Sequence, residues 1–254
     1  MKKLFLLLAA TSSVLFTNCT SSDPIEYDKA NPSITAERIP GINSALPDAW
    51  ELEISGNTLN KIKINSSQED RFTYAGGHIV EVNHFQNGTY VGLEELTYNA
   101  DGSIMAITSK NGSGVVTITK AFNYSNPNLI EEVVSIYNTT TGLVEGNYTT
   151  YKSIVNGNLI QYKFGIDYQT DTMIYDNKLN VFSNLQCLNE LILYYSNDKV
   201  SKNNRITTNS VFTYNGSVVS TSSINYLNQY DLDNRITKTN VTSNNASYIQ
   251  NHTY

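Results

Sequence analysis

The residues that could carry out acid–base or metal chemistry are few and scattered in this chain. Its three histidines are His78, His84 and His252, and no His-Xaa-His spacing indicates zinc. The carboxylate pairs Glu94-Glu95 and Glu131-Glu132 fall in predicted strands, where neighbouring side chains point to opposite faces. Each pair therefore places one carboxylate on either side of a sheet, and no metal or cofactor site is predicted.

Single carboxylates leave one catalytic alternative open. Asp167, Asp171 and Asp176 are placed to approach strand glutamates in a glycosidase-like arrangement. A hydrolase of glycan or cell-wall polymer, acting on the concave face of a sheet, is therefore the alternative to a non-catalytic protein. No nucleophile elbow, phosphate-binding loop or dinucleotide fingerprint accompanies these residues. The turn Asp231-Leu-Asp-Asn234 carries oxygen ligands of the kind that Ca²⁺ binds, but a solvated turn is the simpler interpretation.

The two cysteines have contrasting surroundings. Cys187 lies in Leu185-Gln-Cys-Leu188 with no His nearby in sequence, which predicts a buried and unreactive thiol. Cys19 follows a charged Lys2-Lys3 and a short apolar stretch that polar residues interrupt, so this stretch is too short to span a bilayer. The order of these features predicts an export signal at residues 1–18.

The end of that signal, Phe16-Thr-Asn-Cys19, resembles the relaxed lipobox of Bacteroidota-type surface lipoproteins. The resemblance implies cleavage before Cys19, lipidation of that residue, and a cell-envelope location at the outer membrane, facing the periplasm or the surface. A plain secretory signal with an incidental cysteine is the alternative. Residues 19–50 hold four of the five prolines and many polar residues, and we expect a flexible tether there.

The composition favours an all-β protein and argues against a nucleic-acid partner. The formal net charge is −6 without a basic stripe that would neutralise phosphates. Only 16% of residues are charged, and Asn, Ser, Thr and 18 Tyr take their place. Tyr and Thr favour a half-wet sheet surface, whereas Asn and Gly favour turns.

A repeated unit is seen most clearly from Tyr98 to Ile107, where a strand ends on Tyr, Asp101-Gly102 turns the chain, and an apolar strand follows. Successive intervals of 24, 26, 27 and 24 residues separate Tyr74, Tyr98, Tyr124, Tyr151 and Tyr175. A period near 25 fits two strands and their connections, so the unit is a β-hairpin. Residues 51–254 are therefore predicted to form a single domain, an antiparallel meander of hairpins in a strongly curved sheet or open barrel.

Strand alternation supports this fold. Ile160 to Tyr168 alternate apolar and polar over nine residues, as in a strand with one dry face. A membrane-spanning barrel also alternates, but it needs apolar outward residues on nearly every strand. Segments such as Ser217 to Ser223 are weakly apolar on both faces, which favours a protein that does not span the bilayer. Trp50 is expected to be buried at one end of the sheet, with an exposed sugar-stacking Trp as the alternative.

The repeat is interrupted between Tyr175 and Tyr214, which lie 39 residues apart. Ser183-Asn-Leu-Gln186 fits a capping box, and apolar residues follow at helical spacing. We expect one short helix near 183–194, which is either a core plug or a lid over a ligand cavity. Leu191 to Tyr195 would also suit a strand.

The same interruption carries a family resemblance. Tyr175-Asp-Asn-Lys-Leu-Asn180, Phe182, Ser201-Lys-Asn-Asn204 and a strand ending at Tyr214 together resemble Bacteroidota lipoproteins of unknown function with a porin-like fold. The resemblance covers the chain from about residue 59 to its end, with Val181 in place of the family's Pro. Tyr230-Asp-Leu-Asp-Asn-Arg-Ile236 is similar to the Tyr-Asp repeats of large bacterial surface proteins. Neither resemblance implies a catalytic residue.

These features predict a lipid-anchored, non-catalytic binding or scaffold module of the cell envelope. Tyr-rich faces suit stacking on sugar rings, so glycan capture, with a polysaccharide or an envelope protein as partner, is the leading expectation. A purely structural surface component is a further alternative. Asp171-Thr172-Met173 matches the short O-glycosylation sequon of Bacteroidota-type exported proteins, which makes Thr172 a candidate modification site.

Overall fold

The computed structural model describes residues 32–38, 48–126, 129–165, 168–195, 200–243 and 247–253. The described residues form sixteen strands and one helix, α1 (Leu188–Tyr195), which lies between β12 and β13. The strands are β1 (Ser33–Arg38), β2 (Trp50–Ser55), β3 (Thr58–Ile64), β4 (Gln68–Ala75), β5 (His78–Gln86), β6 (Thr89–Tyr98), β7 (Ile104–Asn111), β8 (Val116–Asn126), β9 (Leu129–Tyr137), β10 (Val144–Val155), β11 (Asn158–Phe164), β12 (Gln169–Leu179), β13 (Asn203–Tyr214), β14 (Ser217–Tyr230), β15 (Ile236–Ser243) and β16 (Ser247–Thr253).

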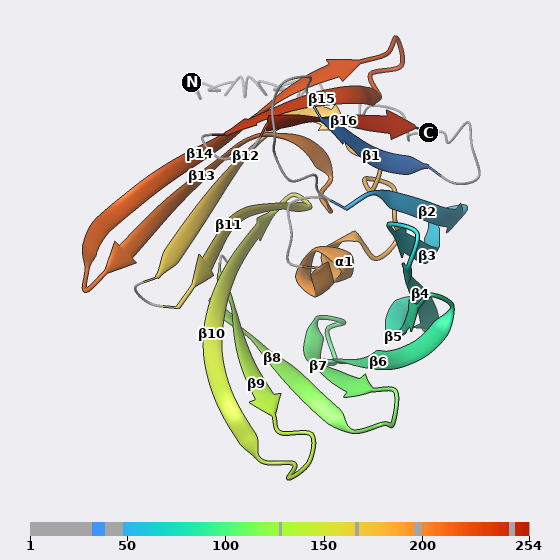
Figure 1. Cartoon of the computed structure of the whole chain (residues 1–254), viewed down its shortest axis with the longest axis vertical. Coiled ribbons are helices and arrows are strands. Elements are labelled where there is room, and N and C mark those ends of the chain that lie inside the picture. The colour runs from blue at the N-terminus through green and yellow to red at the C-terminus, as the bar shows by residue number, and fades with distance from the viewer. Residues whose placement is uncertain are drawn as a thin grey trace, which may run out of the picture.

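All strands pair antiparallel with their neighbours in the chain, and β1 closes the sheet by pairing with both β2 and β16 (Figure 1). The predicted antiparallel meander of hairpins is confirmed, and its curvature is complete, because the sheet forms a closed barrel. The junction between β1 and β2 is short, with Ser33 opposite Glu51 and Ile34 opposite Trp50.

The closing strand corrects the predicted extent of the tether. β1 lies within residues 19–50, yet its six residues pair with β16 in register from Ser33 with Thr253 to Arg38 with Tyr248. The backbone groups of β16 need this partner, since β15 pairs only with its other side. The barrel therefore begins before residue 51. The predicted signal at residues 1–18 lies outside the described residues.

The turns follow the predicted chemistry. Asn156-Gly157 and Asn215-Gly216 have positive φ at both residues, as the tight type I′ turns of two-residue hairpins require. At Asp101-Gly102, Asp101 Oδ1 accepts hydrogen bonds from the backbone and the hydroxyl of Ser103, at 2.9 and 2.7 Å. The alternating segment from Ile160 to Tyr168 is shorter than predicted, because Gly165 adopts φ +65° and turns the chain after β11.

Apolar side chains face the barrel interior, whereas the outer wall carries charges. Buried residues such as Leu52, Ile62, Val82 and Ile107 belong to one core cluster. On the outside, Lys61 pairs with Glu53 at 2.6 Å and Lys110 pairs with Glu95 at 2.7 Å. The same wall also exposes single apolar side chains, such as Met105 on β7 and Ile174 on β12. Among the described residues, no helix is long and apolar enough to cross a membrane.

The core is completed by α1, which lies inside the barrel (Figure 1). Leu188 and Leu191 to Tyr194 are buried, Leu191 and Ile192 fully so, whereas Asn189 is exposed and Glu190 accepts a hydrogen bond from the Ile79 backbone N–H at 2.9 Å. Trp50 is 4% exposed and packs against Phe182 and Tyr195, with ring centroids 6.1 and 5.1 Å away. The predicted burial of Trp50 is confirmed, and the helix is a core plug on this side of the barrel.

The helix begins at Leu188, five residues later than predicted, and the expected capping box does not form. The Gln186 side chain donates to the Gly77 carbonyl at 3.0 Å, and its backbone N–H donates to Asn57. These bonds fix residues 181–187 to two hairpin turns at one barrel end, which we call the plugged end. Cys187 is 5% exposed there, as predicted, and burial raises the pKa of its thiol to about 12.

Candidate functional site

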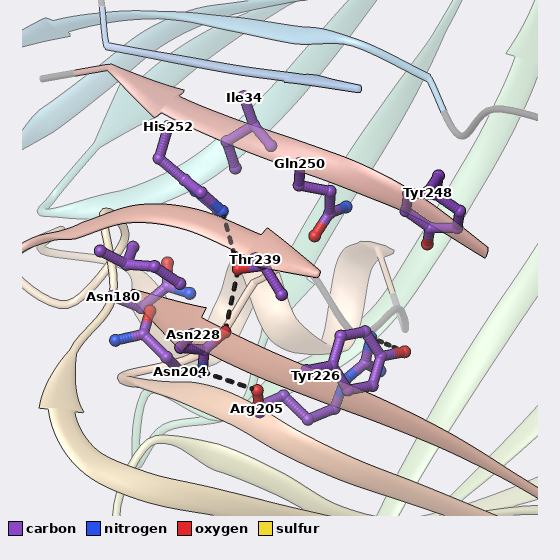
Figure 2. A pocket seen from close by; sticks show the side chains of 11 residues that line it. Ile34, Asn180, Asn204, Arg205, Tyr226, Asn228, Thr239, Tyr248, Gln250 and His252 are labelled. Atoms are coloured by element: carbon purple, nitrogen blue, oxygen red, sulfur yellow. Dashed lines mark hydrogen bonds between the residues drawn. The ribbon is translucent and has the colours of Figure 1, made fainter. Parts of the chain in front are cut away.

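The barrel interior divides into two parts with different chemistry. In the plug half, formed by β2–β10, apolar side chains pack against α1 and residues 181–187. In the cavity half, formed by β13–β16 with β1, mostly polar side chains surround a cavity of about 120 Å³ (Figure 2). Ile34 and Ile236 are the apolar residues of its lining, and the polar ones include Asn204, Tyr226, Asn228, Thr239, Gln250 and His252.

A chain of hydrogen bonds orders one wall of the cavity (Figure 2). Asn228 Nδ2 donates to the Arg205 carbonyl at 3.1 Å, and Asn228 Oδ1 accepts from the Thr239 hydroxyl at 2.9 Å. The Thr239 hydroxyl also lies 3.3 Å from His252 Nε2. Residues on β13, β14, β15 and β16 therefore present fixed polar groups toward one space.

An aromatic surface forms another part of the lining. The Arg205 guanidinium lies over the Tyr226 ring, 4.1 Å from its centroid, and donates a hydrogen bond to the Tyr226 hydroxyl. A stacked cation and a hydroxyl bond hold this ring in one orientation. Tyr248 lines the same cavity (Figure 2).

Asn204 Oδ1 and His252 Nδ1 are buried polar atoms at the cavity for which no hydrogen-bond partner is found among the described residues. Asn204 is 2% exposed, and its Nδ2 lies within bonding distance of the Lys178 and Leu179 carbonyls, at 3.3 and 3.1 Å. Its amide orientation is thereby fixed, with the oxygen left over. A buried polar atom without a partner costs about 1–3 kcal/mol, so a ligand group that bonds it gains that amount.

The His252 imidazole is neutral at neutral pH, because burial lowers its pKa to about 4. A neutral imidazole offers one donor and one acceptor. With the amides and hydroxyls around it, the cavity offers both kinds of hydrogen-bonding group, while Arg205 is the single charged residue in its lining.

A second cluster of titratable residues lies in the plug half around His84. His84 Nδ1 is 2.7 Å from Asp70 Oδ1, and His84 Nε2 is 4.0 Å from Glu94 Oε2. Burial lowers the pKa of His84, but the hydrogen bond and charge of Asp70, with the charge of Glu94, outweigh it and raise the pKa. From α1, Tyr195 donates to Asp70 Oδ2 at 2.8 Å, and the Tyr194 hydroxyl lies 3.4 Å from His84 Nε2. Because α1 supplies these partners, the cluster holds the helix in place.

A buried ion pair also belongs to the interior. Lys152 and Glu132 are paired, and the Thr150 hydroxyl donates to Glu132 Oε2 at 2.6 Å. Lys152 Nζ reaches the Leu193 carbonyl in the last turn of α1, at 3.5 Å. Burial lowers the pKa of Lys152, and Glu132 partly offsets that effect. The pair ties β9 and β10 to the plug.

The glutamate pairs are arranged as the sequence predicts. Glu94 and Glu132 face the interior, whereas Glu95 bonds Lys110 and Glu131 accepts from Asn123 on the outer wall. This prediction is confirmed. The structure does not gather the single carboxylates into one site.

The remaining sequence-predicted residues are dispersed. Asp171 accepts from Gln169, and Asp176 from Tyr230, while Asp167 lies outside the described residues. Asp231 accepts from Arg235 at 2.8 Å, so its carboxylate is already paired with a cation in that turn. Within the described ranges, no three His, Cys, Asp or Glu side chains are grouped to hold a metal ion.

The two predicted modification sites are still untested. Thr172 is exposed on β12, opposite Gln161 of β11, and is accessible from outside the barrel. Cys19 lies outside the described residues.

The sequence analysis missed the cavity. The sequence does contain a pattern that marks it. Gln250 and His252 are two residues apart on β16 and therefore share one face, as Tyr226 and Asn228 do on β14. Only barrel closure shows that these faces meet each other.

Neither the protein-family models nor the curated proteins show a match to this sequence. Similar solved structures include two porin-like proteins from Bacteroides. The one from Bacteroides vulgatus has 12% sequence identity and a TM-score of 0.45, and the alignment covers 87% of this chain and 97% of that one. The one from Bacteroides uniformis has 10% identity and a TM-score of 0.38, with coverage of 88% and 96%. At such values the function must be argued from the residues of this chain alone.

Proposed function

We propose that this chain is a lipid-anchored protein of the cell envelope whose barrel is a non-catalytic binding module, and that its polar cavity takes the end of a glycan. The observation that carries the proposal is the cavity of about 120 Å³ with fixed amide, hydroxyl and imidazole groups and two tyrosines. Sugar hydroxyls both donate and accept hydrogen bonds, and sugar rings pack on aromatic faces.

The size of the cavity limits the ligand. An apolar cavity of about 150 Å³ accommodates one benzene molecule, so a space of about 120 Å³ admits only part of a substituted sugar ring. We therefore expect part of the terminal sugar to enter the cavity, while the rest of the glycan stays outside the barrel. Asn204 Oδ1 and His252 Nδ1 supply acceptor or donor positions that no described residue uses.

Binding is tested with a glycan array, followed by calorimetric titration of the full chain with the glycan that binds. The variant Gln250→Leu keeps the approximate size of a lining side chain and removes its amide, so we expect at least tenfold weaker binding. Asn251→Leu is the matched control, because the next residue on β16 points to the other face of the sheet. Equal affinities for the two variants, or an array without any bound glycan, would reject the cavity as the binding site.

The anchor is tested separately. Globomycin-sensitive labelling with a fatty acid, abolished by Cys19→Ala, is the expected result. Labelling that persists in Cys19→Ala would exclude this cysteine as the lipidated residue and would leave the cavity proposal unaffected.

A further inference from the structure

The barrel end opposite the plugged end has an unusual surface. Consecutive antiparallel strands alternate in direction, so the turns β5–β6, β7–β8, β9–β10 and β13–β14 share one end. At the plugged end, Gln186 bonds to the turns β2–β3 and β4–β5, and Lys202 bonds to the turn β10–β11. In Figure 1, the β9–β10 and β13–β14 hairpins extend away from α1. We call these four hairpin turns the apolar tips.

The apolar tips have no charge. Residues 87–91, 111–116, 138–144 and 213–219 contain no Asp, Glu, Lys or Arg. Each of the four segments instead has an apolar pair beside its turn: Tyr90-Val91, Val115-Val116, Leu143-Val144 and Val218-Val219. The plugged end differs, since its turns carry Asp101, Asp231, Asp233 and Arg235.

These apolar side chains are exposed on both faces of a hairpin. Val218 and Val219 point to opposite faces of β14, and each is 62% exposed. Leu143 is 69% exposed and Tyr214 is 66% exposed. A protein partner that packs on a sheet covers one face, whereas acyl chains and lipid headgroups surround an inserted tip on all sides.

The apolar region is also shallow. Lys110 and Glu145 border two of the tips on β7 and β10, whereas the β13–β14 tip is followed by the polar run Ser220-Thr-Ser-Ser223 and has its nearest charge at Arg205. At about 3.3 Å per residue, three residues span roughly 10 Å, which matches the depth of about 5–10 Å that interfacial elements reach. Tyr is enriched at that interface because its ring is apolar and its hydroxyl is polar.

We propose that the apolar tips insert into the interfacial layer of a lipid bilayer and act as a membrane contact distinct from the lipid on Cys19. The lack of charge points to neutral, zwitterionic lipid rather than to an anionic surface. A second contact of this kind orients the barrel on the bilayer.

The test places a tryptophan at each barrel end and uses the full chain. Tyr214→Trp and Leu232→Trp are mixed with vesicles of phosphatidylcholine and phosphatidylethanolamine that carry brominated acyl chains. Leu232 is fully exposed in the turn at the plugged end. Trp50 is buried, so the native tryptophan contributes the same signal to both variants. We expect quenching and a blue shift for Tyr214→Trp only. Because the readout is local, attachment through the N-terminus does not produce it.

A second pair of substitutions checks the apolar side chains. In the Tyr214→Trp chain, Val218→Thr with Val219→Thr is expected to raise the lipid concentration for half-maximal quenching about tenfold. Leu227→Thr, at a residue 67% exposed on the same strand but away from the tip, is expected to leave it unchanged. The proposal is overturned by no quenching at residue 214, by equal quenching at both ends, or by a blue shift that depends on protein concentration without vesicles, which would indicate self-association.

Discussion

The plug half and the cavity half have the same hairpin backbone and opposite interiors. Around α1, the inward side chains of β2–β10 are mostly apolar and buried, and two charged clusters fix the helix to the wall. Across the barrel, the inward side chains of β13–β16 are mostly amides and hydroxyls that leave a cavity. The hairpin repeat thus determines the wall, while the inward residues alone determine whether a helix or a ligand can fill it.

The largest expected effect is at the buried ion pair. Glu132→Gln leaves Lys152 as a buried cation without its counter-ion, which costs about 3–5 kcal/mol of unfolding free energy. Glu131→Gln, one residue along on the outer wall, is expected to cost less than about 0.5 kcal/mol. Urea unfolding of both variants measures the difference. Similar losses in Glu132→Gln and Glu131→Gln would show that the buried ion pair of the plug half does not stabilise the fold more than the outer wall does.

The two halves should also respond to pH with opposite signs. The pKa of His252 is lowered to about 4, so its contribution is present above the unfolded pKa and is lost as pH falls from about 6.5 to about 4. The pKa of His84 is raised, so its contribution is present below about pH 6.5 and is lost as pH rises through the folded pKa. Each slope has a limit of about 1.4 kcal/mol per pH unit.

Unfolding free energies measured from pH 4 to pH 8 test this contrast. His252→Gln is expected to reduce the loss of unfolding free energy between pH 6.5 and pH 4. His84→Gln is expected to reduce the loss of unfolding free energy above pH 6.5. Asp70, Glu94, Tyr194 and Tyr195 all face His84, so the variant Tyr194→Phe serves as a control that keeps both carboxylates. If stability still falls as steeply below pH 6.5 in His252→Gln, then groups other than His252 cause that fall.

Much of the fold could be predicted from the sequence, because hairpin signals are local. Asn-Gly turns and alternating strands identified the meander, and the interruption after Tyr175 identified the helix. The start of the helix could not be predicted, since Gln186 bonds Gly77, a residue more than 100 positions away. Barrel closure through β1 and the cavity also depend on contacts between distant segments, which no local pattern contains.

The repeated tyrosines show what a local pattern leaves out. Tyr74 and Tyr175 donate to the Leu59 and Leu159 carbonyls at 2.7 and 2.8 Å, and Tyr98 bonds the Ile79 carbonyl in the same way. Each of these bonds joins the end of one strand to the start of the preceding strand at the plugged end. Tyr214 looks like another copy in sequence, but it ends an odd-numbered strand and therefore lies at the opposite end, 66% exposed.

Removing single tyrosine hydroxyls tests that distinction. Tyr98 lies between the Ile79 carbonyl and Glu190 Oε2, which is 2.9 Å away, so Tyr98→Phe removes a partly buried bond to a carboxylate. The expected loss is about 1–2 kcal/mol of unfolding free energy. Tyr214→Phe should change it by less than about 0.5 kcal/mol. Equal losses in thermal or urea unfolding would contradict the assignment of the repeat to the plugged end.

The smallest effect should differ in sign between the halves. Thr150 and Thr208 are both buried on the inner wall, but the Thr150 hydroxyl donates to Glu132, whereas Thr208 Oγ1 has no partner among the described residues. Valine has nearly the same shape and no hydroxyl. Thr150→Val should therefore cost about 1–2 kcal/mol, and Thr208→Val should gain up to about 1 kcal/mol, because it removes a buried group that bonds nothing. Urea unfolding of the two variants decides, and a loss at Thr208 as large as at Thr150 would mean that the cavity half is as tightly satisfied as the plug half.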